Sequence, residues 1–228
     1  MWVVVPCKSL DRAKSRLASV LSAMERRNLV LAMLTDVLDT LAKSNGLQGI
    51  VVTSSDPAIS VLVASYDAEW FSSDCDKDLS SALSSTSRFL EQREPNGVMV
   101  VPGDIPLLSV SDIAAAVEMT GSVPSVMLAP DNLGFGTNLL AMSSTGLMPY
   151  SFGTDSFRRH RSAARACGIE PIIIETPSLG LDIDTPADLS IFMENASQTY
   201  SYDYLIDSSI RERLIEKRET TVPLAKVG

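Results

Sequence analysis

The stretch Trp2-Val3-Val4-Val5-Pro6-Cys7-Lys8 decides the fold, because it is a short apolar run that ends in a basic residue. Four similar runs, rich in Val, Ile and Met, cover residues 49–53, 97–102, 125–129 and 171–175. Short apolar runs of this kind are typical of strands that are buried on both faces, as in parallel sheets. The sequence therefore predicts five buried strands.

Helical patterns lie between these runs. In the longest, Ser22 and Glu25 form a capping box, and apolar residues then recur at three- and four-residue spacing. Helices are expected over residues 22–41, 57–66, 79–92 and 109–120, and another begins at 185. Alternating strands and helices predict an α/β fold in three layers (αβα) with a mostly parallel mixed sheet, and the ligand crevice of such a fold lies at the carboxyl ends of the strands.

The composition changes near the end of the chain. After Asn195 the sequence is polar and carries several tyrosines, and a charged helical stretch follows over residues 209–219. We therefore expect a main domain over residues 1–195 and a C-terminal helical appendage or tail over residues 196–228. This appendage either reaches a partner subunit or stays partly disordered.

Charge and length exclude several classes of protein. With 19 basic and 28 acidic residues the net charge is -9, so a nucleic-acid partner is not expected. No apolar run approaches the roughly 18 residues of a membrane span, and the start lacks a charged leader, so we expect a cytoplasmic protein. Three cysteines without Cys-x-x-Cys spacing and a single histidine argue against a disulfide framework, a zinc site and histidine-based hydrolysis.

A basic loop follows the first strand. Lys8, Arg12, Lys14 and Arg16 lie within nine residues, which is unusual in an acidic chain. One interpretation is a loop that neutralises a triphosphate and its leaving pyrophosphate. The alternative is a solvated surface loop. A Gly-x-x-x-x-Gly-Lys-Ser/Thr motif is absent from the sequence, so a P-loop ATPase or kinase is not supported.

Two acidic segments suggest a magnesium site. In Val100-Val101-Pro102-Gly103-Asp104-Ile105-Pro106 a strand delivers one carboxylate at its carboxyl end. In Leu181-Asp182-Ile183-Asp184 two acids share one side if the segment is extended. Mg²⁺ takes oxygen ligands, commonly one or two carboxylates together with substrate phosphates. The alternative is that Asp104 and Asp184 only stabilise local turns, in which Asp is a favoured residue.

Two glycine-containing turns complete the set of motifs. They are Gly134-Phe135-Gly136-Thr137-Asn138-Leu139-Leu140 and the segment from Phe152 to His160. Glycine allows close backbone approach, and the hydroxyls of Thr137 and Ser156 can bind an anion at an expected helix start. Alone, such turns are more often structural than functional.

Taken together, these motifs resemble the 2-phospho-L-lactate guanylyltransferase family, within the nucleotidyltransferases of the nucleotide-diphospho-sugar transferase (Rossmann-like, glycosyltransferase-A) type. The resemblance covers residues 1–195. Gly136-Thr137-Asn138 and the Phe-Gly-x-x-Ser-Phe-x-x-His segment that starts at Phe152 make it specific, since Gly-Asp-x-Pro occurs throughout the wider group.

The resemblance implies that GTP and 2-phospho-L-lactate give a guanylylated product and pyrophosphate, a step in coenzyme F420 biosynthesis; some relatives use phosphoenolpyruvate. It implies a homodimer that binds GTP and a phosphorylated three-carbon acid. Catalytic residues would be Lys8, Lys14, Arg16 and Asp104. Nucleotide-binding residues would be Pro6, Lys8, Lys14, Arg16 and Gly103. Acceptor-binding residues would be Thr137, Asn138, Gly153, Ser156 and His160. Magnesium ligands would be Asp104, Asp182 and Asp184.

The chain departs from the family pattern at one turn, and rival functions remain. Where a Gly-Leu-Asn-like turn is expected near the base, this chain has Asp78-Leu79-Ser80. A sugar-transferring enzyme would show Asp-x-Asp in place of Gly103-Asp104-Ile105, and a molybdopterin guanylyltransferase would have a Gly-rich first loop. A non-catalytic nucleotide sensor would bind nucleotide without releasing pyrophosphate.

Overall fold

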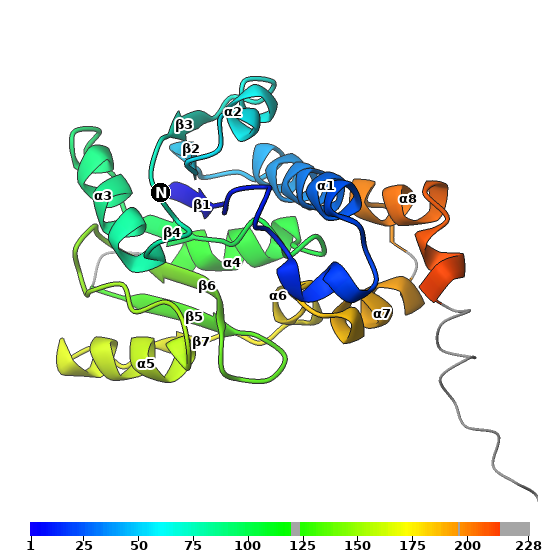
Figure 1. Cartoon of the computed structure of the whole chain (residues 1–228). Coiled ribbons are helices and arrows are strands. Elements are labelled where there is room, and N and C mark those ends of the chain that lie inside the picture. The colour runs from blue at the N-terminus through cyan, green and yellow to red at the C-terminus, as the bar shows by residue number, and fades with distance from the viewer. Residues whose placement is uncertain (120–123, 196, 215–228) are drawn as a thin grey trace, which may run out of the picture.

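The sheet is the centre of the molecule. The computed structural model describes residues 1–119, 124–195 and 197–214. The strands are β1 (Trp2–Pro6), β2 (Gly49–Thr53), β3 (Glu69–Phe71), β4 (Val98–Val100), β5 (Val126–Pro130), β6 (Thr137–Met142) and β7 (Ile172–Ile173). They form one sheet in the order β3-β2-β1-β4-β6-β5-β7, in which only β6 runs antiparallel to its neighbours (Figure 1). The expected mostly parallel mixed sheet is confirmed.

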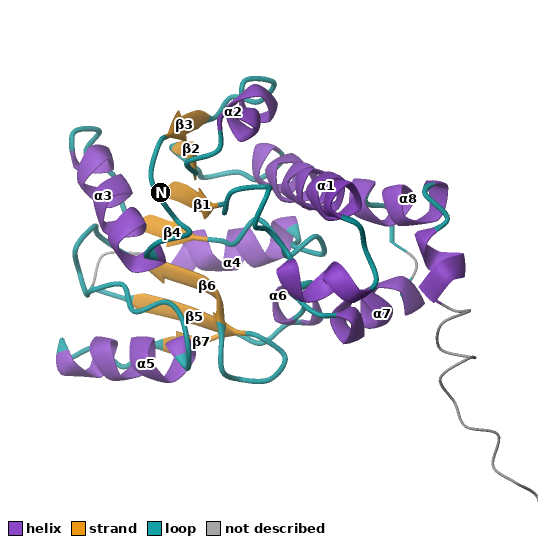
Figure 2. Cartoon of the chain, viewed as in Figure 1, coloured by secondary structure: helices purple, strands orange, loops and turns teal. Residues whose placement is uncertain are grey.

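Helices cover both faces of this sheet (Figure 2). They are the 3-10 helix η1 (Ser15–Ser19), α1 (Ala23–Ala42), α2 (Pro57–Val63), α3 (Leu79–Glu91), α4 (Val110–Met119), α5 (Ser156–Ala166), α6 (Pro177–Gly180), α7 (Pro186–Glu194) and α8 (Tyr200–Asp207). The expected helices are present, and the capping boxes at Ser22 and Thr185 form as the sequence predicts. The end expected at residue 120 lies outside the described residues.

The side chains of β1 point alternately to the two faces of the sheet, and this explains the three layers. Val3 and Val5 belong to a large apolar cluster shared with α1, α4 and α7. Trp2 and Val4 belong to a second cluster, shared with α3 and α5. Because successive side chains of a strand point to opposite faces, a run that is apolar throughout has to be covered on both sides.

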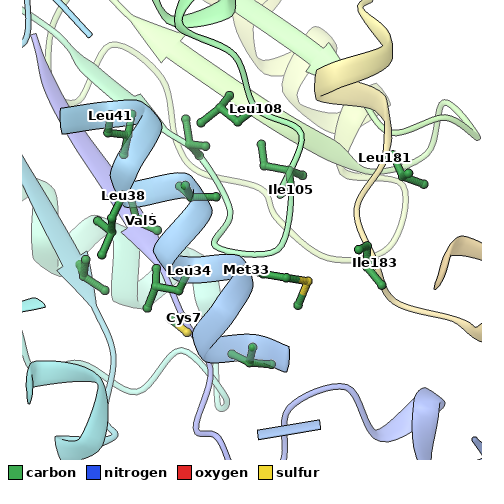
Figure 3. Close-up of a cluster of buried hydrophobic side chains, with 14 of the residues drawn as sticks. Val5, Cys7, Met33, Leu34, Leu38, Leu41, Ile105, Leu108, Leu181 and Ile183 are labelled. Atoms are coloured by element: carbon green, nitrogen blue, oxygen red, sulfur yellow. The ribbon is translucent and has the colours of Figure 1, made fainter. Parts of the chain in front are cut away.

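The α1 face of the sheet also fixes the two acidic loops. Figure 3 shows Met33 extending from α1 toward the segments that carry Ile105 and Ile183. Both isoleucines are fully buried, and each directly follows an aspartate of a predicted metal site. The Ile183 N–H donates to the carbonyl oxygen of Asp104 at 3.1 Å. Core packing therefore positions both acidic loops.

Three strands differ from the sequence prediction. The run 171–175, expected to be a buried strand, contains only β7, which has two residues, lies at the sheet edge and leaves Ile173 37% exposed. The segment expected to be a turn over residues 134–140 contains the start of β6, whose six residues are all buried. β6 hydrogen-bonds to a strand on each side, and this pairing stabilises an extended Thr137-Asn138 that propensity alone does not predict. β3 was not predicted because it has three residues and lies at the sheet edge.

The C-terminal segment packs on α1. The buried Asp36 carboxylate accepts hydrogen bonds from the backbone N–H groups of Tyr200 and Ser201, at 2.6 and 3.0 Å, and from the Ser201 hydroxyl. Leu205 and Ile210 are fully buried in the same apolar cluster as α1. Residues 210–214 are helical, whereas 215–219 of the expected charged stretch lie outside the described residues. Among the residues described, no helix is long and apolar enough to span a membrane.

We predict that Met33→Ala lowers the free energy of unfolding by about 2–5 kcal/mol, because it leaves a cavity beneath α1. Met33 is fully buried, whereas Met24 on the same helix is 65% exposed. Met24→Ala is therefore a matched control and should change stability by less than about 0.5 kcal/mol. Urea denaturation measures both values, and equal losses would contradict the packing described for α1.

Candidate active site

A cleft of about 440 Å³ opens at the carboxyl ends of β1 and β4. Its lining includes Pro6, Lys8, Arg12, Lys14, Arg16, Gly103, Asp104, Gly136, Thr137, Asn138, Phe152, Gly153, Asp182 and Asp184. Because β6 runs antiparallel to β4, its amino end lies at the same edge of the sheet and brings Thr137 and Asn138 to the cleft. Five segments that are distant in sequence thus meet at one place.

The basic loop is fixed by two carboxylates that bind its backbone. The N–H of Ser9 donates to Asp76 at 3.0 Å, and the N–H of Leu10 donates to Asp56 at 2.9 Å. Lys14 adopts the left-handed conformation, with φ of 54°, which is costly for a residue with a Cβ. This local geometry turns the Lys14 side chain inward, and only 6% of it is exposed, whereas the Arg16 side chain is 72% exposed.

The Lys14 ammonium lies between two aspartates. Its Nζ is 2.5 Å from Asp104 Oδ2 and 2.7 Å from Asp184 Oδ1. Burial by itself lowers the pKa of Lys14, but the two carboxylates outweigh it and raise the pKa above its usual value. Burial likewise raises the pKa of Asp184, and here the cations, Lys14 foremost, outweigh it and lower the pKa. Arg16 adds a longer contact of 3.6 Å to Asp184.

Asp182 has a different environment. Its Oδ1 accepts a hydrogen bond from Asn138 Nδ2 at 3.2 Å. Burial, and then the negative charge of Asp104, raise the pKa of Asp182 to about 6. Within the described residues, no three His, Cys, Asp or Glu side chains already converge as metal ligands. The cleft instead holds two mutually repelling carboxylates, Asp104 and Asp182, whose hard oxygen atoms suit a divalent cation such as Mg²⁺.

A group of hydroxyls forms the opposite wall. Thr137 Oγ1 lies 3.0 Å from His160 Nδ1, and Ser156 Oγ donates to the same oxygen at 3.1 Å. His160 Nε2 accepts a hydrogen bond from the backbone N–H of Ser151 at 2.9 Å. Burial, and then the positive charge of Arg159, lower the pKa of His160 to about 4, so the ring is neutral near pH 7. Thr137 is thus the member of this group that meets the cleft.

The structure brings most of the predicted site residues together. All of those named for nucleotide or metal lie on the cleft, as do Thr137, Asn138 and Gly153. Ser156 and His160 are buried behind Thr137, outside the cleft lining. Asn138 contacts Asp182 and the carbonyl oxygen of Leu179, so its amide links β6 to the acidic loop.

Sequence reasoning missed the residues that support the site. Two aspartates, Asp56 and Asp76, carry the long-range contacts to the basic loop, and the other oxygen of Asp56 caps α2. Asp56 is the N-cap of α2, the helix expected from residue 57, and no pattern in the sequence indicated its second contact, with Leu10. Cys7 and Cys75 also line the cleft, and burial raises the pKa of both thiols.

The sheet and cleft define an α/β protein of the nucleotidyltransferase type. A solved structure from Desulfovibrio desulfuricans, classed with the nucleotide-diphospho-sugar transferases, aligns with a TM-score of 0.73 over 93% of this chain and 97% of its own, at 16% identity. This likeness establishes the fold.

The chain belongs to the family described as Guanylyl transferase CofC like, whose profile matches residues 1–221. Two relatives are named phosphoenolpyruvate guanylyltransferase. The one from Rubrobacter xylanophilus is 34% identical over 83% of this chain and 92% of its own length, and the one from Chloroflexus aggregans is 34% identical over 80% and 91%. The resemblance inferred from the motifs is confirmed, and the chain is a guanylyltransferase.

We predict that Lys14→Met lowers the free energy of unfolding by about 1–3 kcal/mol at pH 7, because two carboxylates lose their cation. The pKa of Asp184 is lowered in the fold, so its ion pair stabilises above the unfolded pKa of about 3.9 and weakens as the pH falls. The loss in Lys14→Met should therefore shrink between pH 7 and pH 3.

The control is Lys43→Met, since Lys43 is 69% exposed and pairs with Asp39 on the surface of α1. Such pairs contribute at most about 1 kcal/mol. Denaturant unfolding across this pH range measures both variants. A loss in Lys14→Met that stays constant with pH would show that the ion pair with Asp184 is not its cause.

Proposed function

We propose that this guanylyltransferase uses phosphoenolpyruvate as acceptor, transferring GMP from GTP and releasing pyrophosphate. The observation that supports this reaction is that a basic loop, three carboxylates and Thr137 line the same cleft. The names of the two relatives support phosphoenolpyruvate over the 2-phospho-L-lactate that the motifs first suggested. Both are phosphorylated three-carbon acids, so they make the same demands on this cleft.

The reaction is a substitution at the α-phosphorus of GTP. A phosphate oxygen of the acceptor forms the new bond, the bond from the α-phosphorus to the bridging oxygen breaks, and pyrophosphate leaves with that electron pair. The acceptor phosphate is mostly ionised at pH 7, because its second pKa is about 6, so no general base is needed. The chief obstacle is repulsion between two anions, and the chain must supply positive charge.

The basic loop supplies that charge where the triphosphate would lie. Lys14 is fixed in position by its two carboxylates, whereas Arg16 and Lys8 are exposed. We assign Lys14 and Arg16 to the developing charge on pyrophosphate and Lys8 to the triphosphate. In a chain of net charge -9, this local concentration of cations is what admits an anionic substrate.

The carboxylates fit a divalent cation, and we propose Mg²⁺. Asp104 and Asp182 would hold it, with Asp184 close by and paired to Lys14. Bound there with substrate phosphate oxygens, the ion would lower the negative charge at the attacked phosphorus. Asn138 donates to Asp182 and so orients that carboxylate.

Pathway and assembly are also proposals. We assign the product to coenzyme F420 biosynthesis on the family resemblance, and we expect a homodimer. Sedimentation velocity measures the assembly directly. A mass of 24.5 kDa at micromolar concentration would contradict the dimer.

The deciding experiment measures pyrophosphate release with GTP and Mg²⁺, in parallel with phosphoenolpyruvate, 2-phospho-L-lactate, a sugar phosphate or no acceptor. ATP replaces GTP as a control for the base, which matters because Asp78-Leu79-Ser80 departs from the family pattern. Release with phosphoenolpyruvate and GTP supports the proposal. Pyrophosphate release with phospholactate but not with phosphoenolpyruvate would show that phospholactate is the acceptor. GTP binding without pyrophosphate release from any mixture would indicate a nucleotide sensor.

We predict that Asp104→Asn lowers turnover at least about 100-fold, the scale expected for removing one preorganised electrostatic group. The expected cause is weaker cation binding, so added Mg²⁺ should restore part of the activity. Asp207→Asn, on the exposed end of α8, is the matched control and should behave as wild type. A folded Asp104→Asn protein with normal turnover would remove Asp104 from the metal site.

Thr137→Val should raise KM for the acceptor about tenfold while leaving KM for GTP within a factor of about two, because one hydrogen bond to an anion is lost. Valine keeps the shape of the side chain and removes its hydroxyl. Steady-state kinetics with each substrate varied in turn provide the measurement. Equal changes in both KM values would contradict the assignment of Thr137 to the acceptor.

A further inference from the structure

His160 is the single histidine of the chain, is fully buried, and lies outside the cleft lining. It nevertheless contacts Thr137, which does line the cleft. We propose that His160 is a positioning residue, which orients the Thr137 hydroxyl so that its proton points into the cleft as a donor to an anionic oxygen of the acceptor. This inference rests on the proposed function, because it specifies how the same cleft binds its acceptor.

The position of the proton on the ring follows from the backbone. The Ser151 N–H can only donate, and it points at His160 Nε2 at 2.9 Å. Nε2 therefore carries the lone pair. A neutral imidazole has one N–H, so the proton must be on Nδ1. The neighbouring Phe152 ring stands nearly edge-on to the imidazole, with centroids 4.7 Å apart and planes at 70°, and restricts ring rotation.

The orientation of the Thr137 hydroxyl follows in turn. With Nδ1 protonated, the 3.0 Å contact is a hydrogen bond from His160 to Thr137 Oγ1. The Ser156 hydroxyl donates to the same oxygen at 3.1 Å. Two donors occupy both lone pairs of Oγ1, so its own proton has to point elsewhere. Among the described residues, Thr137 Oγ1 has no hydrogen-bond partner besides His160 and Ser156, and Thr137 borders the cleft.

A fixed donor differs from an ordinary hydroxyl. A free threonine hydroxyl rotates and can present either a lone pair or a proton. The donor pair of His160 and Ser156 removes this choice before the ligand arrives, so binding an anion costs less ordering. The low pKa of His160 keeps the ring neutral over the working range of pH, so the arrangement holds with changing pH.

Nitrogen NMR tests the first step on the unmodified protein. Because the chain has one histidine, ¹⁵N labelling of histidine gives only the two ring signals of His160. We expect a protonated Nδ1 and an unprotonated Nε2 from pH 6 to pH 8. A proton on Nε2, or a charged ring, would overturn the proposal without any reference to activity.

Two variants separate the two ring nitrogens. In His160→Asn the amide nitrogen replaces Nδ1 and can still donate to Thr137, while the contact with Ser151 is lost. In His160→Gln the amide oxygen replaces Nε2 and can still accept from Ser151, while the donor to Thr137 is lost. We expect His160→Gln to raise KM for phosphoenolpyruvate about tenfold with KM for GTP unchanged, and His160→Asn to stay within about threefold of wild type.

A structural role alone would give another result. If His160 only fills the core, both variants should lose stability and should affect both substrates alike, and that outcome overturns the proposal. A double variant adds a further check: Thr137→Val already lacks the hydroxyl, so adding His160→Gln should raise KM for the acceptor no further. Additive effects would contradict action through Thr137.

The same experiments separate the two proposals. If the wild type releases no pyrophosphate with phosphoenolpyruvate, the proposed acceptor fails, and the NMR result still decides the hydrogen-bond arrangement. The kinetic comparison then runs with whichever acceptor the wild type uses. If the wild type is active and His160→Gln equals it in KM, the positioning role fails while the proposed function stands.

Discussion

One buried cation connects the parts of this site. Lys14 reaches from the loop after β1 to Asp104 after β4 and to Asp184 before α7. Without a cation, burying these two carboxylates side by side would be costly. The ammonium between them offsets their repulsion. The same contact fixes the distance between the basic and acidic walls. A left-handed backbone at Lys14 is tolerated because these two ion pairs stabilise it.

The direction of one strand is the second constraint. In a wholly parallel sheet, the residues that begin a strand lie at the edge opposite the crevice. β6 runs against its neighbours, so Thr137 and Asn138 begin their strand at the crevice and can face Asp182. One hydroxyl and one amide of the cleft are therefore placed on a rigid strand, and not on loops.

Much of this was readable from the sequence, for definable reasons. Apolar runs and capping boxes are local, so β1, β2, α1 and α7 could be predicted from neighbouring residues alone. The motifs around Lys14, Asp104 and Thr137 are also local, and they predicted which residues meet at the cleft. β6 was missed because its pairing partners are distant in sequence, as was the contact of Asp56 with Leu10. No sequence pattern predicts that His160 lies behind Thr137, because only the fold brings β6 and α5 together.

The contact between α1 and α8 has a consequence for how the chain is made. Asp36 lies on a helix near the start of the chain, yet the two N–H groups that satisfy its carboxylate belong to Tyr200 and Ser201. Because a ribosome makes the amino end first, α1 emerges with this carboxylate in contact with water and part of its apolar surface uncovered. The segment that covers this surface follows more than 160 residues later, so until it is made the surface is open to association with other molecules.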